Sequence, residues 1–96
     1  MDTNRVIKAM KALSNKNRFE IFMDIYKANK QATYEEEDCF VYEILKRYNI
    51  GAPTISHHLK ELSNADLIIT ERRGKQIVAR INEETLKELS NVFDIE

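Results

Sequence analysis

The sequence predicts a mainly α-helical domain that carries one small β-hairpin. Apolar residues recur at helical spacing along most of the chain, whereas two β-prone runs flank Gly74-Lys75. Only two Gly and one Pro interrupt the 96 residues. Because a chain of this length supports one small core, we expect a single domain over residues 1–96, with about five helices and a two-stranded hairpin.

The N-terminal half contains three predicted helices. Residues 6–13 carry apolar side chains at the spacing of a short first helix. Ser14 or Asn15 can cap a second helix, which is apolar over most of its circumference and should form the centre of the core. Residues 35–38 predict a solvated acidic loop that ends with Asp38 as the cap of a third helix over residues 41–48. The aromatic residues of these helices are expected in the core rather than in a ligand pocket: Phe19, Phe22, Tyr26, Tyr42 and Tyr48.

The strongest functional pattern lies in residues 50–66. Asn49 to Gly51 predict a tight turn in which Asn and Gly accept positive φ, and Ala52-Pro53 begin a helix. Wound at about 100° per residue, this helix has two faces. One face is apolar and should be buried. The opposite face is small, polar and weakly basic, which suits a helix that enters a groove and touches base edges and phosphates. This presented face gathers Pro53, Ser56, His57, Lys60 and Asn64.

A hairpin with a basic tip follows this helix. Residues 68–73 and 76–81 are β-prone, and Gly74 supplies the positive φ that a tight hairpin loop needs. Arg72, Arg73 and Lys75 surround the tip. A helix-turn-helix followed by such a hairpin predicts the winged helix-turn-helix fold. Asn82 can then cap a last amphipathic helix.

From Gly51 to Ile81 the chain resembles the ArsR family of bacterial and archaeal repressors. That family shares a Pro-Thr-(Val/Ile)-Ser-x-His-Leu core, matched here by residues 53–59, then Ala-Gly-Leu and an Arg-rich wing with Gly at its tip. Residues 12–18 match a second family segment. Asp66 stands where the family usually has Gly. Because Asp adopts the left-handed conformation less easily, the helix end should be strained or differently capped.

The resemblance implies a homodimeric repressor that binds double-stranded DNA at an imperfect palindromic operator. The recognition helix, about 52–65, should enter the major groove, and the wing, 68–81, should lie on the adjacent groove or backbone. The expected DNA contacts are Ala52, Pro53, Thr54, Ser56, His57, Lys60, Arg72, Arg73 and Lys75.

The first and last helices carry more apolar side chains than so small a domain should bury alone. In the ArsR family these helices form the dimer interface. The resemblance therefore implies an interface made by Val6, Ile7, Met10, Leu86, Leu89, Val92 and Phe93.

Two other interpretations stay open, a dimeric protein-interaction module and a repressor switched by oxidation of Cys39. Many metal-sensing relatives carry a Cys-x-Cys pair, which falls at Phe40 and Tyr42 here, so those ligands are missing. A lone thiolate offers too few ligands for a zinc site. We favour a plain buried thiol for Cys39 over a redox sensor.

The adjacent histidines do not form a metal pair, because neighbouring helical positions point about 100° apart. We expect His58 to pack at the edge of the core with a hydrogen-bonded ring, and His57 to face DNA. The chain has no Gly-rich phosphate loop, nucleophile elbow or fixed carboxylate pair. We therefore expect no enzyme activity, no metal and no cofactor, and the sequence does not name an effector.

Charge and composition limit the partners further. The net charge is −1, yet residues 51–81 hold five Lys or Arg against three acids, so the positive charge lies where DNA is expected. This modest field predicts strongly salt-sensitive binding. No apolar run approaches the roughly 20 residues of a membrane span, and the N-terminus lacks a secretion signal. Together with a single cysteine, these features predict a cytoplasmic protein.

Overall fold

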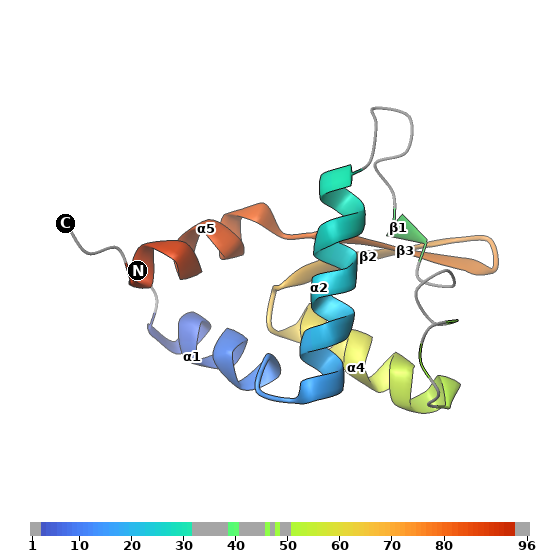
Figure 1. Ribbon diagram of the computed structural model, residues 1–96, viewed down its shortest axis with the longest axis horizontal. Coiled ribbons are helices and arrows are strands. Elements are labelled where there is room, and N and C mark those ends of the chain that lie inside the picture. Colours follow the sequence, from blue (N-terminus) through green and yellow to red (C-terminus); the bar gives the residue numbers. More distant parts are fainter. Residues whose placement is uncertain (1–2, 32–38, 41–45, 47, 49–50, 94–96) are drawn as a thin grey trace.

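The computed structural model describes residues 3–31, 39–40, 46, 48 and 51–93 (Figure 1). Its elements are α1 (Thr3–Ala12), α2 (Lys16–Gln31), β1 (Cys39–Phe40), α4 (Ala52–Asn64), β2 (Ile68–Arg73), β3 (Gln76–Ile81) and α5 (Glu83–Val92). This mainly helical architecture with an antiparallel hairpin confirms the predicted fold class. Within the described ranges there are four helices. The helix expected over residues 41–48 and the cap expected at Asp38 fall outside those ranges, apart from Lys46 and Tyr48.

Asparagine side chains begin two of the helices, as the sequence predicts. Asn15 Oδ1 accepts a hydrogen bond from the backbone N–H of Arg18 at 3.0 Å, at the start of α2. Asn82 Oδ1 accepts one from the N–H of Thr85 at 3.4 Å, at the start of α5. Each bond satisfies an amide that the first helical turn leaves unpaired.

The start of α4 differs from the expectation of a positive φ at Gly51. Gly51 has φ −67° and ψ 152°, which is extended backbone, and it is the N-cap residue. Its carbonyl accepts hydrogen bonds from the N–H groups of Thr54 and Ile55, both at 3.1 Å. The positive-φ prediction for Gly51 is wrong because an N-cap residue takes β-region dihedrals. Asn49 lies outside the described residues.

The end of α4 closes through a left-handed residue. Asp66 has φ 59°, and it is the only non-glycine residue with positive φ in the described part of the chain. The N–H of Asp66 bonds to the carbonyl of Ser63, and the N–H of Leu67 bonds to that of Leu62, both at 3.0 Å. This pair of bonds is the Schellman motif. The helix end is therefore strained at Asp66, as expected.

The strands form one antiparallel sheet in the order β1-β3-β2. In the hairpin, Ile68 pairs with Ile81 and Arg73 pairs with Gln76, so Gly74 and Lys75 form a two-residue loop. Gly74 has φ 62°, which confirms the predicted positive φ. The predicted two-stranded wing is therefore confirmed, and a short third strand that the sequence did not predict adds to it, since Cys39 and Phe40 pair with Ala79 and Val78. They lie along the edge of β3 opposite β2, where the N–H and C=O groups of an edge strand are open to pairing.

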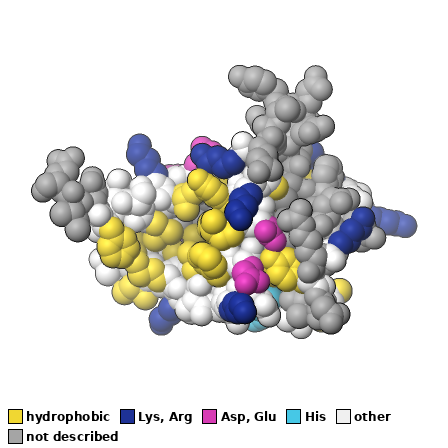
Figure 2. All heavy atoms as spheres, viewed as in Figure 1, with side chains coloured by type: hydrophobic (Ala, Val, Ile, Leu, Met, Phe, Trp, Pro, Cys, Tyr) yellow, Lys and Arg dark blue, Asp and Glu magenta, His cyan; other side chains and the backbone are white. Residues whose placement is uncertain are grey.

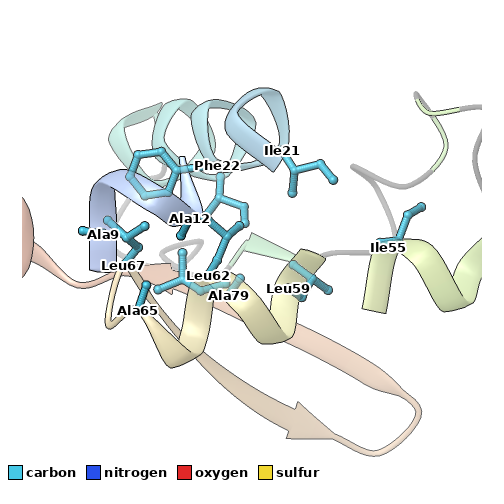
Figure 3. Packing of buried hydrophobic residues seen from close by; sticks show 12 residues of the cluster. Ala9, Ala12, Ile21, Phe22, Ile55, Leu59, Leu62, Ala65, Leu67 and Ala79 are labelled. Atoms are coloured by element: carbon cyan, nitrogen blue, oxygen red, sulfur yellow. The ribbon is translucent and has the colours of Figure 1, made fainter. Parts of the chain in front are cut away.

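The core lies where α2 crosses α4 and the sheet (Figure 1). Leu62 and Leu67 meet Phe22, Ala12 and Ala79 in its centre (Figure 3). The other buried apolar residues include Ile21, Ile25, Ile55, Leu59, Ile68 and Val78.

The aromatic side chains of α2 are divided between the core and the surface. Phe22 is buried as predicted, whereas Phe19 is 45% exposed, so its expected place in the core is wrong. Phe19 shares with Met23 and Tyr26 a helix stripe that points away from the buried Ile21 and Ile25. Tyr26 and Tyr48 are half-buried. The burial expected of Tyr42 falls on a residue outside the described part.

Helices α1 and α5 lie together at one end of the molecule, and the hairpin tip lies at the other (Figure 1). Arg5 of α1 joins the two helices. Its guanidinium donates hydrogen bonds to Thr85 Oγ1 at 2.9 Å and to Glu88 Oε1 at 3.2 Å, both on α5. Arg5 Nε is also 4.0 Å from Asp66 Oδ2, just after α4. One side chain therefore connects α1, α5 and the end of α4.

Candidate nucleic-acid interface

Helix α4 separates its side chains into a buried face and an exposed face. Ile55, His58, Leu59 and Leu62 are buried against the rest of the domain. This arrangement follows from helical spacing, since these positions are three or four residues apart. The predicted burial of the apolar face is confirmed for Ile55, Leu59 and Leu62.

The exposed face of α4 carries all six residues of this helix that the sequence suggests for DNA contact. They are small or polar and include one cation: Ala52, Pro53, Thr54, Ser56, His57 and Lys60. The acidic residue of this helix, Glu61, is half-buried and lies off that face. An anionic backbone can therefore approach the N-terminal half of α4 without meeting a carboxylate of the helix.

His58 fixes α4 to α2. It is 5% exposed, and its Nδ1 accepts a hydrogen bond from Arg18 Nε at 3.4 Å. Arg18 also donates to the carbonyl of Ala12 at 3.3 Å, so it spans the turn between α1 and α2. The predicted place of His58 at the edge of the core, with a bonded ring, is confirmed. Its neighbour His57 is exposed.

The environment of His58 favours the neutral ring. Burial lowers the pKa of His58 below its ordinary value of 6.5, and the positive charges of Arg18 and His57 lower it further. A neutral ring is also what the geometry requires, because a protonated Nδ1 cannot accept the hydrogen bond from Arg18. His58 therefore acts as a structural acceptor.

The hairpin extends its basic tip beyond the core. Arg72, Arg73 and Lys75 are exposed around Gly74, while Val78 and Ala79 anchor the inner half of β3. Gly at the first loop position with positive φ is the pattern of a type II′ turn. Arg73 Nη2 lies 3.3 Å from Glu71 Oε2 in an exposed pair. Such an exposed pair is weak in water.

A shallow groove of about 250 Å³ separates α4 from the hairpin. Its lining adds Ser63, Asn64 and Thr70 to the predicted Ser56 and Lys60. The sequence patterns did not indicate these three residues as contacts, although Asn64 falls on the presented arc of the helix. Ser63 and Thr70 become neighbours only through the packing of α4 on β2, which spacing along the chain does not reveal.

The residues suggested for dimerisation differ in exposure. Ile7 and Met10 on α1 are 46% and 41% exposed, and Phe93 after α5 is 71% exposed. Leu86, Leu89 and Val92 are half-buried. Val6 is 7% exposed and packs inside its own subunit, so it offers little surface to a partner. Figure 2 shows the resulting apolar surface across the end of the molecule formed by α1 and α5.

The structure adds two observations on metal and membrane. Among the described residues, no group of three or more His, Cys, Asp or Glu side chains is placed to hold a metal ion. Cys39 lies in β1, but the burial predicted for its thiol concerns a side chain outside the described part. No helix in the described ranges is both long and apolar enough to cross a membrane.

Comparison with solved structures supports the fold. An ArsR-like transcriptional regulator from Rhodococcus sp. RHA1 superposes with a TM-score of 0.72 at 20% identity, over 93% of this chain and 76% of that one. A homodimeric winged helix-turn-helix DNA-binding domain from Mycobacterium bovis gives 0.68 at 22% identity, over 93% of this chain and 75% of that one. These similarities confirm the winged-helix architecture.

Comparison of sequences identifies the family. Residues 35–70 match the family described as bacterial regulatory protein, arsR family. The arsenical resistance operon repressor of Staphylococcus xylosus is 27% identical over 86 residues, which cover 90% of this chain and 74% of that protein. The transcriptional repressor SdpR of Bacillus subtilis (strain 168) is 32% identical over 81 residues, covering 84% of this chain and 80% of that protein. The chain therefore belongs to the ArsR family of bacterial regulatory proteins.

Proposed function

We propose that this chain is a homodimeric transcriptional repressor that binds an imperfect palindromic operator. Helix α4 enters the major groove, and the hairpin of β2 and β3 lies on the adjacent groove or backbone. Membership of the ArsR family supports this function. So do the two sequence relatives, which are both named as repressors.

The observation that carries the proposal is the division of α4 into two faces. Its buried face is fixed by Ile55, Leu59 and Leu62, and its exposed face offers Ser56, His57 and Lys60 close to the helix N-terminus. Polar side chains of this kind form hydrogen bonds with base edges and with phosphates. The exposed N-terminal residues of a recognition helix are the ones that reach base edges in related folds.

Dimerisation is proposed to use the apolar surface of α1 and α5. The large apolar side chains exposed at this end of the molecule are Ile7, Met10 and Phe93. Exposed apolar surface of this kind indicates an interaction site. A two-fold dimer would present two α4 helices to successive major grooves, about 34 Å apart. The operator should therefore consist of two inverted half-sites. The Mycobacterium bovis structural neighbour is described as homodimeric.

Affinity would come mainly from cations that neutralise phosphates, and specificity from α4 and from the shape of the DNA. Lys60, Arg72, Arg73 and Lys75 are exposed on the proposed surface. Four such contacts per subunit predict binding that weakens steeply with salt. Repression follows if the bound dimer covers a promoter and excludes the polymerase.

The test begins with selection of bound DNA from a random pool, at low salt, with the full chain. We expect a palindromic sequence to be recovered and to bind in a mobility-shift assay. Lys60→Ala and Arg73→Ala should each weaken binding, whereas Lys16→Ala, an exposed cation at the start of α2, should not. Failure to recover any sequence, with no salt-dependent binding, would contradict the proposal and favour a protein-interaction module.

A further inference from the structure

A second cavity lies away from the proposed DNA surface. It has a volume of about 480 Å³ and is formed between α2, the end of β3 and the first turns of α5. Sites for small organic ligands typically have about 300–1,000 Å³. None of the residues proposed to contact DNA lines this cavity. It shares only Leu86 with the proposed dimer surface.

Asn29 lines the cavity and carries a buried hydrogen-bond donor that has no partner in the described part of the chain. Its Oδ1 accepts a hydrogen bond from the backbone N–H of Ile81 at 2.7 Å, which fixes the orientation of the amide. The Nδ2 atom of the same group is buried and has no hydrogen-bond partner among the described residues. A buried amide donor without a partner destabilises the folded state. A ligand that displaces the side chains covering this atom would satisfy it with an acceptor.

Two lysines give the cavity a positive rim. Lys30 and Lys87 line it from opposite helices, and Lys30 Nζ lies 5.6 Å from the centre of the Tyr26 ring. Within the described part of the chain, neither ammonium group forms an ion pair with a carboxylate. Glu83 also lines the cavity, so the charged lining has one net positive charge. This balance favours an anion and gives a divalent cation only one carboxylate.

The remaining lining is largely apolar. Tyr26, Ile81 and Leu86 contribute ring and aliphatic surface, and Ser90 contributes a hydroxyl. Figure 2 shows hydrophobic side chains bordered by basic ones in the region where α5 meets α2. An inorganic ion would make no contact with this apolar surface. An uncharged hydrocarbon would form no ion pair with the lysines and no hydrogen bond with the Asn29 amide.

We propose that this cavity binds a small organic anion with an apolar body, such as a medium-chain carboxylate. The hydrocarbon packs on Tyr26 and Leu86, and the carboxylate lies between Lys30 and Lys87 and accepts a hydrogen bond from Asn29 Nδ2. Charge-assisted hydrogen bonds of this kind are about twice as strong as neutral ones.

The direct test uses octanoate as the probe and 1-octanol as an uncharged molecule with the same chain length. Each is titrated into the full chain by calorimetry, without DNA, so the outcome does not depend on DNA binding. We expect octanoate to bind about tenfold more tightly than 1-octanol, as one charge-assisted contact implies. Equal affinities, or no binding of octanoate because a partner subunit fills the cavity, would overturn the proposal.

Two variants separate this site from general attraction of an anion. Asn29→Asp keeps an acceptor for the Ile81 N–H and replaces the donor by a negative charge, so it should abolish octanoate binding. Lys30→Gln combined with Lys87→Gln should weaken octanoate about tenfold and leave 1-octanol unchanged. The control, Lys8→Gln combined with Lys16→Gln, removes the same charge from exposed positions outside the cavity.

Unchanged octanoate affinity in the Lys30/Lys87 variant, or an equal loss in the control, would overturn the site. These two lysines are on the surface, so the variant should fold even if Asn29→Asp does not. In the unmodified protein, the side-chain amide resonance of Asn29 should also shift on addition of octanoate. Circular dichroism and sedimentation velocity check the fold and the oligomeric state of each variant.

Discussion

Arg18 Nε donates a hydrogen bond to Nδ1 of the buried His58 at 3.4 Å, and this contact joins α2 to the inner face of α4. The helix proposed to read DNA is therefore held by an acceptor that protonation removes. The same Arg18 donates through Nη1 to the carbonyl of Ala12, so one side chain links α4 to the turn between α1 and α2.

Stability should decrease as the pH falls below 6.5, the ordinary pKa of histidine. The folded protein lowers the pKa of His58, so below pH 6.5 the unfolded chain binds a proton that the folded chain resists. The contribution of His58 is thus fully present above pH 6.5 and is lost as the pH falls toward the folded-state pKa. Urea unfolding at several pH values between 7.5 and 5.5 measures this loss.

The matched variants for this prediction are His58→Asn and His57→Asn. In His58→Asn the new side chain would keep an acceptor near the position of Nδ1 but would not titrate, so the pH dependence in this window should become shallower. His57→Asn changes the exposed neighbour and removes only the smallest cause of the lowered pKa of His58, so it should keep most of the pH dependence. Identical pH profiles for the unmodified protein and His58→Asn would show that His58 is not responsible.

Asp66→Gly should stabilise the domain. Asp66 has φ 59°, a conformation that glycine adopts without the Cβ clash. We expect Asp66→Gly to be about 1 kcal/mol more stable to urea than Asp66→Ala, which keeps a Cβ. Both variants remove the carboxylate that lies 4.0 Å from Arg5, so their difference isolates the backbone term. If the two variants unfold at the same urea concentration, the left-handed conformation carries no strain.

Arg5→Ala should weaken the contact between α1 and α5 and lower the free energy of unfolding. The guanidinium donates to Thr85 Oγ1 and Glu88 Oε1, and Thr85 is buried. Removal of a charged donor from partly buried acceptors should cost about 2 kcal/mol of unfolding free energy. Lys8→Ala, at an exposed position of the same helix, should cost little. Chemical denaturation followed by circular dichroism compares the two, and equal losses would argue against a specific role for Arg5.

A charge placed on the apolar end of the molecule should dissociate the proposed dimer. Ile7→Glu and Phe93→Glu put a carboxylate on exposed surface of α1 and beyond α5, which association would have to desolvate. Sedimentation velocity should show a shift from dimer to monomer. Ile69→Glu is the control, because Ile69 is also exposed but lies on β2. Dissociation by Ile69→Glu, with dimers kept in the other two variants, would place the interface on the hairpin.

Single cations on the proposed DNA surface should alter the salt dependence of binding. The slope of log Kd against log salt should become shallower by about one for each phosphate that a variant no longer neutralises. Lys60→Ala and Arg72→Ala each remove one cation per subunit, so each should reduce the slope of the dimer by about two. An unchanged slope for either variant, measured by fluorescence anisotropy, would remove that side chain from the proposed DNA surface.

The sequence predicted those parts of the fold that depend on residues close together in the chain. Helical spacing identified the buried Ile55, Leu59 and Leu62, and the caps at Asn15 and Asn82 follow from the need to pair free amides. The turn at Gly74 follows from its lack of a Cβ. The Asp66 end was also predictable, since the family motif showed where glycine is usual.

Other features depend on contacts between distant residues, and the sequence did not reveal them. Cys39 and Phe40 form a strand by pairing with the distant β3. Phe19 is 45% exposed although Met23 and Tyr26 on the same stripe of α2 are half-buried, and helical spacing alone does not show where along the stripe the cover ends. The cavity between α2 and α5 joins Asn29 to Lys87, 58 positions apart, and neither residue forms a motif.

The separation of α4 into a buried and an exposed face also affects how readily such a regulator could evolve to bind new DNA sequences. Ala52, Ser56 and His57 are exposed, and none of their side chains is engaged in a hydrogen bond with the described part of the domain. Exchanging them should change which bases are preferred without unfolding the protein. A library diversified at these three positions, with the inner face left intact, is therefore a direct route to reprogrammed operator choice.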